Sequence, residues 1–182
     1  MSVADHKKAG PRSVGCAVVT VSDTRSPATD TSGALLKARL EAGGHRIVSY
    51  EILPDEPARI RDRVRALAEA DVEAVLLSGG TGIAPRDTTY EAVVGILDRR
   101  LDGFGELFRS LSYQEIGTAA MLSRAVAGTL LSTFVFNETA TTESYTRMHA
   151  LTLHVPVAIS AAKGGRRAAA LAEMCGAAPP ER

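Results

Sequence analysis

Cysteine is scarce in this chain, and its scarcity excludes two kinds of site. The 182 residues include only Cys16 and Cys175, one in an apolar run and the other near the end of the sequence. Two cysteines so far apart form neither a disulfide framework nor a paired-cysteine metal site. His149 and His154 are five positions apart, which does not place them on one face of a helix. We therefore expect no zinc site and a reducing, cytoplasmic environment.

Long apolar runs and an excess of charge of one sign are also missing. No stretch reaches the roughly 18 apolar residues that a membrane-spanning helix needs, and no apolar signal-peptide core follows the two lysines near the N-terminus. The 21 basic and 21 acidic side chains cancel, and they form no basic stripe. We thus expect neither a membrane nor a nucleic acid as partner.

What the chain does contain is a regular alternation of strand and helix patterns. Residues 14–21 are a β-branched run typical of a strand buried on both faces, and Asp30 or Thr31 can cap a helix that continues to about Leu40. Further strands are expected at 46–53 and 74–77, and further helices at about 60–70 and 88–97. This alternation predicts an α/β fold of three layers, with a mostly parallel central sheet between helices.

The middle of the chain has weaker signals. Thr88 and Glu91 have the spacing of a capping box, which predicts a helix that opens directly after residue 87. The glycines of LDGFGELFR indicate a turn, which is followed by an apolar helical face of Leu107, Phe108 and Leu111.

The remaining pattern sets the expected domain limits. Residues 132–136 resemble a buried strand and 143–153 a helix. We expect a single domain over 14–165, a flexible lead at 1–13 and an alanine-rich tail at 166–182.

A glycine cluster follows the strand predicted at 74–77. Gly79, Gly80 and Gly82 provide bare backbone between a strand and a helix, where successive N–H groups can converge on a phosphate. The pattern is not a P-loop, because no lysine follows the last glycine, and Pro85 replaces the third glycine of a dinucleotide fingerprint. A tight turn without a ligand is the alternative.

Two aspartates are expected at the same edge of the sheet. Asp87 closes the glycine stretch, and Asp55 follows the preceding strand. Carboxylates beside a phosphate site are favoured where Mg²⁺ bridges them to the anion. The alternatives are a helix cap for Asp87 and an Asx turn for Asp55.

Further polar groups stand where they could line the same site. They are Ser22, Asp23 and Arg25 after the first strand, and later Gly103, Gly105, Glu106, Ser123 and Arg124. For Arg124, a buried ion pair with Glu106 is the structural alternative. No Gly-x-Ser-x-Gly elbow of a serine hydrolase is present.

A resemblance to a known family rests on several of these stretches in one order. They are VTVSDTR, DTSG, LPDE, LLSGGTGIAPRD, LDGFGELFR and LSYQEIGTAAMLSRAVAG. The set resembles the MoaB/MogA family of molybdenum cofactor biosynthesis proteins, and its MoaB branch in particular. The resemblance implies an α/β fold, a homotrimer or homohexamer, and binding of molybdopterin. In catalytic members it implies transfer of AMP from Mg-ATP to the terminal phosphate of molybdopterin.

The resemblance also assigns roles by motif. Asp55 and Asp87 match the two essential acids, with catalytic and Mg²⁺-binding roles. The residues that match ligand-binding segments are Gly79, Gly80, Thr81 and Gly82 in the phosphate loop, and Ser22, Asp23, Gly105, Glu106, Ser123 and Arg124 elsewhere.

The chain departs from the family at two places. Thr24 stands where the family has an arginine, and Arg25 follows it. A Pro-Gly turn that lines the pterin site in the family is replaced by VFNETATTESY, with no proline or glycine between Leu130 and Val155. We expect weaker molybdopterin binding for this reason, and tighter binding if Asn137-Glu138 is replaced by Pro-Gly.

These departures keep two rival functions open. One is a non-catalytic homologue that binds the pterin or serves as an oligomeric scaffold. The other is a nucleotide-binding α/β protein unrelated to pterins.

Overall fold

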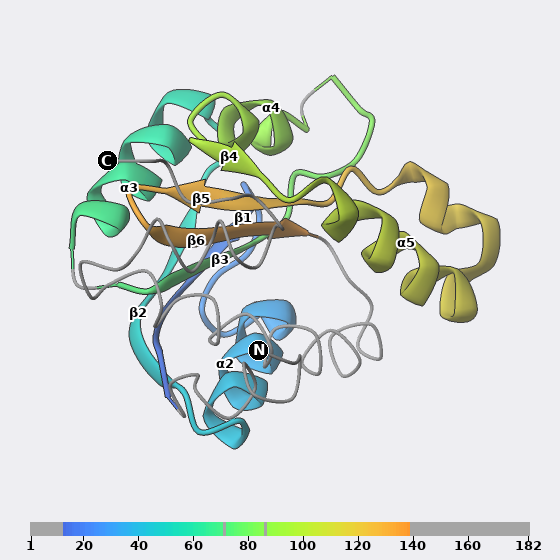
Figure 1. The fold of residues 1–182 in the computed structure, drawn as a ribbon. Helices are drawn as coiled ribbons and strands as arrows, with labels where there is room; N and C mark the ends of the chain where they lie inside the picture. Colours follow the sequence, from blue (N-terminus) through green and yellow to red (C-terminus); the bar gives the residue numbers. More distant parts are fainter. Residues whose placement is uncertain (1–12, 71, 86, 139–182) are drawn as a thin grey trace, which may run out of the picture.

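The computed structural model describes residues 13–70, 72–85 and 87–138 (Figure 1). The strands are β1 (Gly15–Val21), β2 (Arg46–Leu53), β3 (Ala74–Ser78), β4 (Arg99–Arg100), β5 (Val126–Leu130) and β6 (Thr133–Glu138). The helices are α2 (Thr31–Ala42), α3 (Pro57–Glu69), α4 (Thr89–Val94), α5 (Asp102–Ile116) and the short 3₁₀ helix η1 (Gly117–Leu122). Residues 1–12 of the lead expected at 1–13, the helix at 143–153, the domain end at 165 and the alanine-rich tail lie outside the described residues.

The described strands form one sheet in the order β2-β1-β3-β6-β5-β4. Strands β2, β1, β3 and β6 run parallel to one another, β5 is antiparallel to β6, and β4 is antiparallel to β5. The mostly parallel sheet predicted from the alternating pattern is therefore confirmed. The four parallel strands end at one edge, where ligands of α/β proteins usually bind.

Two apolar cores, one on each face of the sheet, give the predicted three layers. Cys16 and Val18 of β1 belong to the core covered by α2 and α5. Ala17 and Val19, which alternate with them, belong to the core covered by α3 and α4. All seven residues of β1 are buried, as a strand covered by helices on both sides requires.

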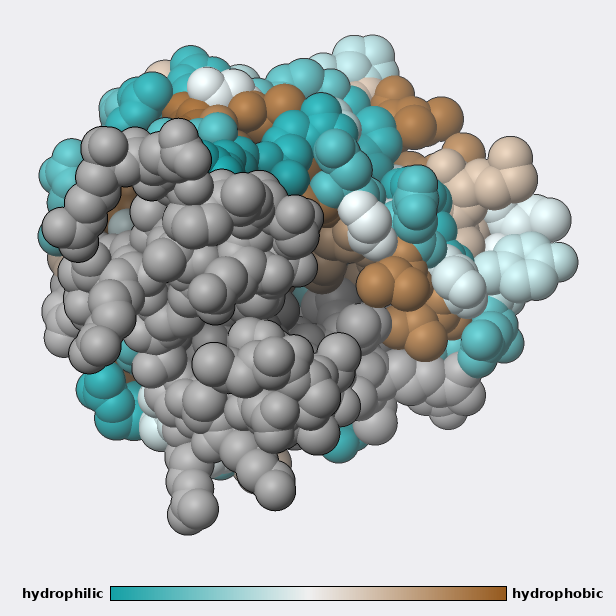
Figure 2. All heavy atoms as spheres, viewed as in Figure 1, coloured by the Kyte–Doolittle hydropathy of each residue, from teal (hydrophilic) through white to brown (hydrophobic). Residues whose placement is uncertain are grey.

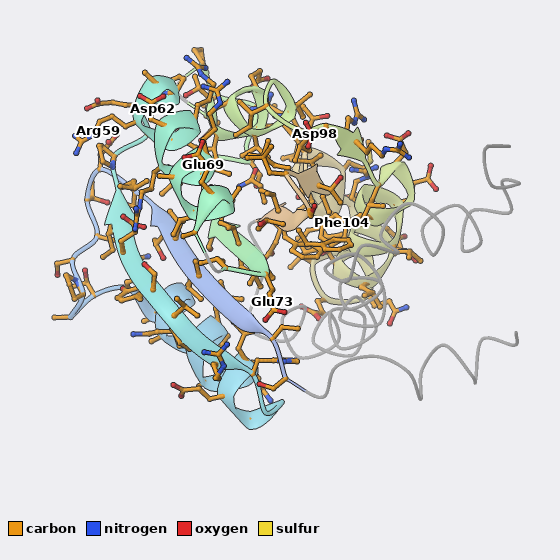
Figure 3. The ribbon with its side chains drawn as sticks, turned by 60° about the vertical axis from the view of Figure 1, so that its left-hand side comes forward. Arg59, Asp62, Glu69, Glu73, Asp98 and Phe104 are labelled. Atoms are coloured by element: carbon orange, nitrogen blue, oxygen red, sulfur yellow. The ribbon has the colours of Figure 1, made fainter. Side chains whose placement is uncertain are left out.

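The strand at 126–130 and its hairpin to β6 are absent from the sequence-based prediction. Leu130 pairs with Thr133, so the turn consists of Leu131 and Ser132, with φ values of 50° and 82°. Such turns favour glycine or asparagine, and neither is present. Asp98 Oδ2 accepts a hydrogen bond from Leu131 N at 2.8 Å, which holds the turn from outside the hairpin. Asp98 is labelled in Figure 3.

The predicted turn at the glycines of LDGFGELFR is wrong. Gly103 and Gly105 lie inside α5, which begins at Asp102. A Cβ at Gly105 would lie 2.8 Å from Ala125 O, so this glycine lets α5 approach the start of β5 closely.

The predicted apolar face of α5 is only partly correct. Phe108 is buried and Leu111 is partly buried, but Leu107 is 53% exposed. The helix extends away from the sheet (Figure 1), so part of it lies beyond the layers that cover the sheet.

The surface of α3 is polar, as expected for a helix over a globular core. Arg59, Asp62 and Glu69 lie along this helix in Figure 3, and the Arg59 and Asp62 side chains are mostly exposed. Among the described residues, no helix has the length and apolar character needed to cross a membrane.

Candidate functional site

The carboxyl ends of the parallel strands bring most of the predicted site residues to one edge. Ser22 and Asp23 follow β1, Asp55 follows β2, and the glycine loop of residues 79–82 follows β3. Strand β6 ends beside that loop at Glu138, whose backbone oxygen accepts a hydrogen bond from Gly79 N at 3.3 Å. The edge thus gathers segments from four strands that are neighbours in the sheet.

Asp55 connects three of these segments. Its backbone N–H donates to Asp23 Oδ1 at 3.1 Å. Its Oδ1 accepts hydrogen bonds from the hydroxyls of Thr88 and Thr89 at 3.1 and 3.2 Å. The carboxylate is therefore oriented by the start of α4 rather than by its own loop, in contrast to the Asx-turn alternative.

The same contacts replace the predicted capping box. The side chain of Thr88 makes no capping hydrogen bond to α4, although Thr88 is the N-cap residue. Glu91 forms an ion pair with Arg124 instead of returning to the cap. The helix itself is confirmed, but it begins at Thr89 and its α-helical part ends at Val94, earlier than predicted.

The glycine loop is packed so closely that its glycines cannot be replaced without a shift. Gly79 and Gly80 have φ values of +116° and +61°. A Cβ would lie 2.3 Å from Val21 O at Gly79 and 2.0 Å from Thr89 Oγ1 at Gly80. These positions require glycine for both conformation and space.

The two acids lie against successive glycines of this loop. A Cβ at Gly80 would lie 3.2 Å from Asp55 Oδ2, and a Cβ at Gly82 would lie 2.4 Å from Asp87 Oδ2. Asp87 Oδ2 also accepts a hydrogen bond from Ala84 N at 3.0 Å, so the carboxylate closes its own loop instead of capping α4. The structure thus brackets the loop with two carboxylates, as the parallel-sheet argument predicted.

This donor set fits Mg²⁺ in part. The described residues contain no cluster of three or more histidine, cysteine or acidic side chains able to hold a metal alone. Mg²⁺ is commonly held by one or two carboxylates together with substrate phosphates and water. Asp55 and Asp87 on either side of a backbone suited to phosphate match that requirement, because the substrate would supply the remaining oxygen ligands.

Arg124 hydrogen-bonds to the backbone at the C-terminal end of the loop. Its Nε donates to Gly82 O at 2.8 Å and its Nη2 to Asp87 O at 2.5 Å. Its Nη1 pairs with the Glu91 carboxylate, and the guanidinium lies 5.1 Å from the ring centroid of Tyr90. The proposed ion pair with Glu106 is not formed, because Glu106 lies on the exposed side of α5.

A cavity of about 300 Å³ opens on the other side of Arg124. Its polar lining comes from Arg100, Asp102, Arg109, Ser123 and Arg124, together with the backbone of Gly105. The structure therefore places Gly105, Ser123 and Arg124 together, as predicted, but separates them from Glu106, which does not line the cavity.

The charges around this cavity are partly paired. Arg100 lies 3.0 Å from Asp102 Oδ1, and Arg109 Nη1 donates to Ser123 O at 3.3 Å. The buried Ser123 Oγ has no hydrogen-bond partner in the part of the chain that the structure describes. The guanidinium groups of Arg100, Arg109 and Arg124 outnumber the carboxylates paired with them, Asp102 and Glu91, which makes the cavity suited to an anionic ligand.

Ser22 is turned toward its own loop. Its Oγ accepts hydrogen bonds from Thr24 N at 3.3 Å and Arg25 N at 3.2 Å. Arg25 Nη1 donates to Thr29 O at 2.7 Å on the exposed side. In this segment, Asp23 reaches the site by accepting a hydrogen bond from Asp55 N. Ser22 and Arg25 stabilise the loop that follows β1.

Next to it, Asp30 anchors the start of α2. Its carboxylate caps Gly33 N at 2.9 Å and accepts hydrogen bonds from Thr20 Oγ1 at 2.6 Å and Tyr50 OH at 2.7 Å. Burial opposes its ionisation, but these hydrogen bonds and the charge of Arg25 hold its pKa below the ordinary value. Burial and the bond to Asp30 raise the pKa of Tyr50 to about 12.

The first two residues of the segment expected to depart from the family still belong to a strand. Asn137 and Glu138 remain in β6 and are buried, and Asn137 pairs with Leu77 and with Val126. A proline at 137 would stand in a strand with neighbours on both sides, where it is disfavoured. The strand position therefore argues against the Pro-Gly substitution at 137–138, whose effect on binding stays a prediction, and residues 139 onward lie outside the described residues.

Several residues of the site carried no sequence signal. Thr88 was expected only as part of a capping box, and Thr89, Arg100 and Arg109 were not singled out. Asn137 was noted only as part of the missing turn. Their positions follow from long-range packing, which the local sequence pattern does not encode.

Comparisons with known proteins agree with this geometry. A family model described as a probable molybdopterin-binding domain matches residues 17–148. A protein named molybdenum cofactor biosynthesis protein B from Halalkalibacterium halodurans is 55% identical over 130 residues, which cover 70% of this chain and 76% of that protein. A protein of the same name from Bacillus subtilis is 50% identical over 139 residues, covering 75% and 82% of the two chains.

Solved structures give the same result. A crystal structure of a molybdenum cofactor biosynthesis protein B superposes with a TM-score of 0.73 at 42% identity, covering 81% of this chain and 97% of that one. The tungsten cofactor synthesizing protein MoaB from Pyrococcus furiosus superposes with a TM-score of 0.68 at 30% identity, covering 78% and 91%.

Proposed function

The chain belongs to the family of probable molybdopterin-binding domains, and from this premise we propose that it binds molybdopterin and adenylylates it with Mg-ATP during molybdenum cofactor biosynthesis. The observation that carries the proposal is the glycine loop, closed to any Cβ at Gly79, Gly80 and Gly82 and bracketed by Asp55 and Asp87.

The reaction would join two phosphates. An oxygen of the terminal phosphate of molybdopterin attacks the α-phosphorus of ATP, a new P–O bond forms, and the bond to the β-phosphate breaks, so pyrophosphate leaves with its electron pair. The attacking phosphate is already anionic near neutral pH, so the site needs alignment and charge neutralisation more than a strong base.

The residues of this chain divide that work. The amides of residues 79–82 would orient the phosphates, and Asp55 and Asp87 would hold Mg²⁺, which neutralises charge on the phosphates when bound. Thr88 and Thr89 orient the carboxylate of Asp55. Substitution of either threonine should therefore weaken Mg²⁺ binding without removal of a metal ligand.

We place part of molybdopterin in the cavity beside Arg124. Its three guanidinium groups suit an anion, and Tyr90, Leu101 and Met121 add apolar surface for a ring. Arg124 contacts both this cavity and the loop, so it links the two halves of the site.

The test is incubation of the purified chain with molybdopterin and Mg-ATP, with detection of adenylylated pterin and of pyrophosphate. We expect product, and its loss in Asp55→Asn, in Asp87→Asn and after removal of Mg²⁺. Asp98→Asn is a matched control, because Asp98 holds the β5–β6 turn outside the site. Product formation by Asp87→Asn at the wild-type rate would overturn the metal role of Asp87.

A non-catalytic scaffold is the second candidate. The observation that favours it is Glu138, a carboxylate only 2% exposed at the end of β6, beside a loop proposed to bind anions. In this case the chain would bind molybdopterin but form no adenylylated product in the same assay.

We also propose that the chain forms a homo-oligomer. Exposed apolar side chains gather on α5 and η1, namely Leu107, Tyr113, Ile116, Met121 and Leu122. Figure 2 shows hydrophobic surface on the right-hand side, where α5 lies in Figure 1. A second copy of the chain would cover this surface. Light scattering that gives only a mass near 19.1 kDa at micromolar concentration would refute this proposal.

A further inference from the structure

Both backbone polar groups of Gly79, the first glycine of the loop, form hydrogen bonds with the end of β6. Gly79 N donates to Glu138 O at 3.3 Å, and Gly79 O accepts a hydrogen bond from Asn137 Nδ2 at 3.1 Å. Asn137 is completely buried, so its side chain does not reach a bound ligand. Among the described residues, the hydrogen bond of its amide goes to the backbone of the loop.

This contact fixes the direction of the next N–H group. The peptide between Gly79 and Gly80 is planar and trans, so its C=O and N–H point in opposite directions. Because Asn137 draws Gly79 O toward β6, the N–H of Gly80 is turned away from β6. Without that bond the peptide could rotate, since both flanking glycines allow a wide range of φ and ψ.

The fold alone does not explain an asparagine here. Asn137 lies in β6 between Leu77 of β3 and Val126 of β5, both of which belong to the apolar core covered by α3 and α4. Its buried Oδ1 has no hydrogen-bond partner within the described ranges, which costs free energy that an apolar side chain would avoid. Leucine, of similar size, would suit the surrounding core better.

We propose that Asn137 is a positioning residue that holds the Gly79–Gly80 peptide in the orientation needed to bind phosphate. The inference rests on the proposed function, because it assumes that the loop binds the phosphates of a nucleotide. It adds a role for a residue that touches neither substrate nor metal.

The test measures stability and binding separately in the full chain. Inorganic pyrophosphate with Mg²⁺ is titrated calorimetrically into the wild type, Asn137→Leu and Thr133→Val. Thr133 is the matched control, because it is a buried polar residue at the other end of β6 and donates to Val72 O at 3.0 Å, far from the loop.

The two variants should behave in opposite ways. Asn137→Leu is expected to keep or raise the urea midpoint of unfolding but to weaken pyrophosphate binding by about tenfold, which corresponds to about 1.4 kcal/mol. Thr133→Val is expected to lower the urea midpoint and leave the affinity unchanged. A purely structural role for Asn137 would give a lower midpoint and an unchanged affinity, and that result would overturn the proposal.

Asn137→Asp gives a second test that does not depend on the leucine variant folding. A protonated carboxyl can donate to Gly79 O as the amide does, whereas a carboxylate cannot. Relative to wild type at each pH, pyrophosphate affinity of this variant should recover as the pH falls through the pKa of the new carboxyl, which burial raises. A ratio that stays constant and well below one as the pH falls from 9 to 5 would overturn the proposal.

The same titration separates this inference from the proposed function. If the wild type does not bind pyrophosphate, the phosphate role of the loop fails and the positioning role fails with it. If the wild type binds and Asn137→Leu binds equally well, only the positioning role fails.

Discussion

Removal of the Arg124 guanidinium should destabilise the glycine loop mainly because hydrogen bonds are lost, and only secondarily because a charge is lost. Arg124 donates to Gly82 O and to Asp87 O, and it is only 27% exposed. Hydrogen bonds to a charged group are worth about 1.5–3 kcal/mol each, and partial exposure favours the lower end, so the two together should stabilise the fold by about 3 kcal/mol. The ion pair with Glu91, whose side chain is 59% exposed, should add less than about 1 kcal/mol.

Arg124→Lys isolates this effect. Lysine keeps the charge but has a single nitrogen, which cannot reach two carbonyl oxygens in the fork geometry of a guanidinium. We expect a loss of about 1.5 kcal/mol in the free energy of unfolding for Arg124→Lys, and about 3 kcal/mol for Arg124→Met. Domains of ordinary stability remain folded after such losses.

Urea unfolding and amide hydrogen exchange together test the prediction. Arg124→Lys should increase the exchange rate of the amides at 79–84 more than that of amides in β1, because the loop opens locally. Glu91→Gln is the matched control and should change the free energy of unfolding by less than about 1 kcal/mol. If Glu91→Gln costs as much as Arg124→Lys, or if loop exchange is unchanged in Arg124→Lys, the guanidinium–carbonyl argument is wrong.

Four other substitutions test parts of the fold. The pKa of Asp30 is lowered in the folded state, so its stabilising contribution is present above its unfolded pKa and is lost as acid protonates it. The pKa of Tyr50 is raised to about 12, so its contribution is present below about pH 10 and is lost as the pH rises toward 12. Tyr50→Phe should therefore lower the free energy of unfolding at pH 7 and remove part of the alkaline loss measured by urea titration. Leu131→Asn should raise the thermal midpoint, with a gain of about 1 kcal/mol, because asparagine tolerates the φ of 50° better than leucine. Gly105→Ala should destabilise the chain because its Cβ would lie 2.8 Å from a backbone oxygen, whereas Gly103→Ala, with no atom within 4 Å, should be neutral or stabilising by calorimetry.

Much of the parallel half of the fold could be predicted, because there the local sequence patterns agree with the packing of the whole domain. The buried run of β1, the cap of α2 and the apolar stripe of α3 each act within a few residues. The meeting of Asp55 with the glycine loop followed from one rule, that parallel strands place their carboxyl ends at one edge. That rule needs no knowledge of which strand lies beside which.

The antiparallel half could not be predicted, because its local signals are missing or supplied from elsewhere. The β5–β6 turn contains Leu131 and Ser132 at positive φ, and the compensating hydrogen bond comes from Asp98, more than 30 positions away. For Arg124, an ion pair with Glu106, on the preceding helix α5, was the structural alternative. Arg124 pairs with Glu91 because the turn before β5 faces α4.

The same distinction explains why the support of the site was less predictable than its acids. Which residue of β6 stands beside Gly79 depends on the register of β6 against β3, in which Asn137 is opposite Leu77. A shift of one residue would place Phe136 or Glu138 there and turn the amide to the other face of the sheet. The identity of the residues that hold the site in place therefore depends on strand register. The identity of the residues that bracket it depends only on where the strands end. A single sequence predicts strand ends far better than register.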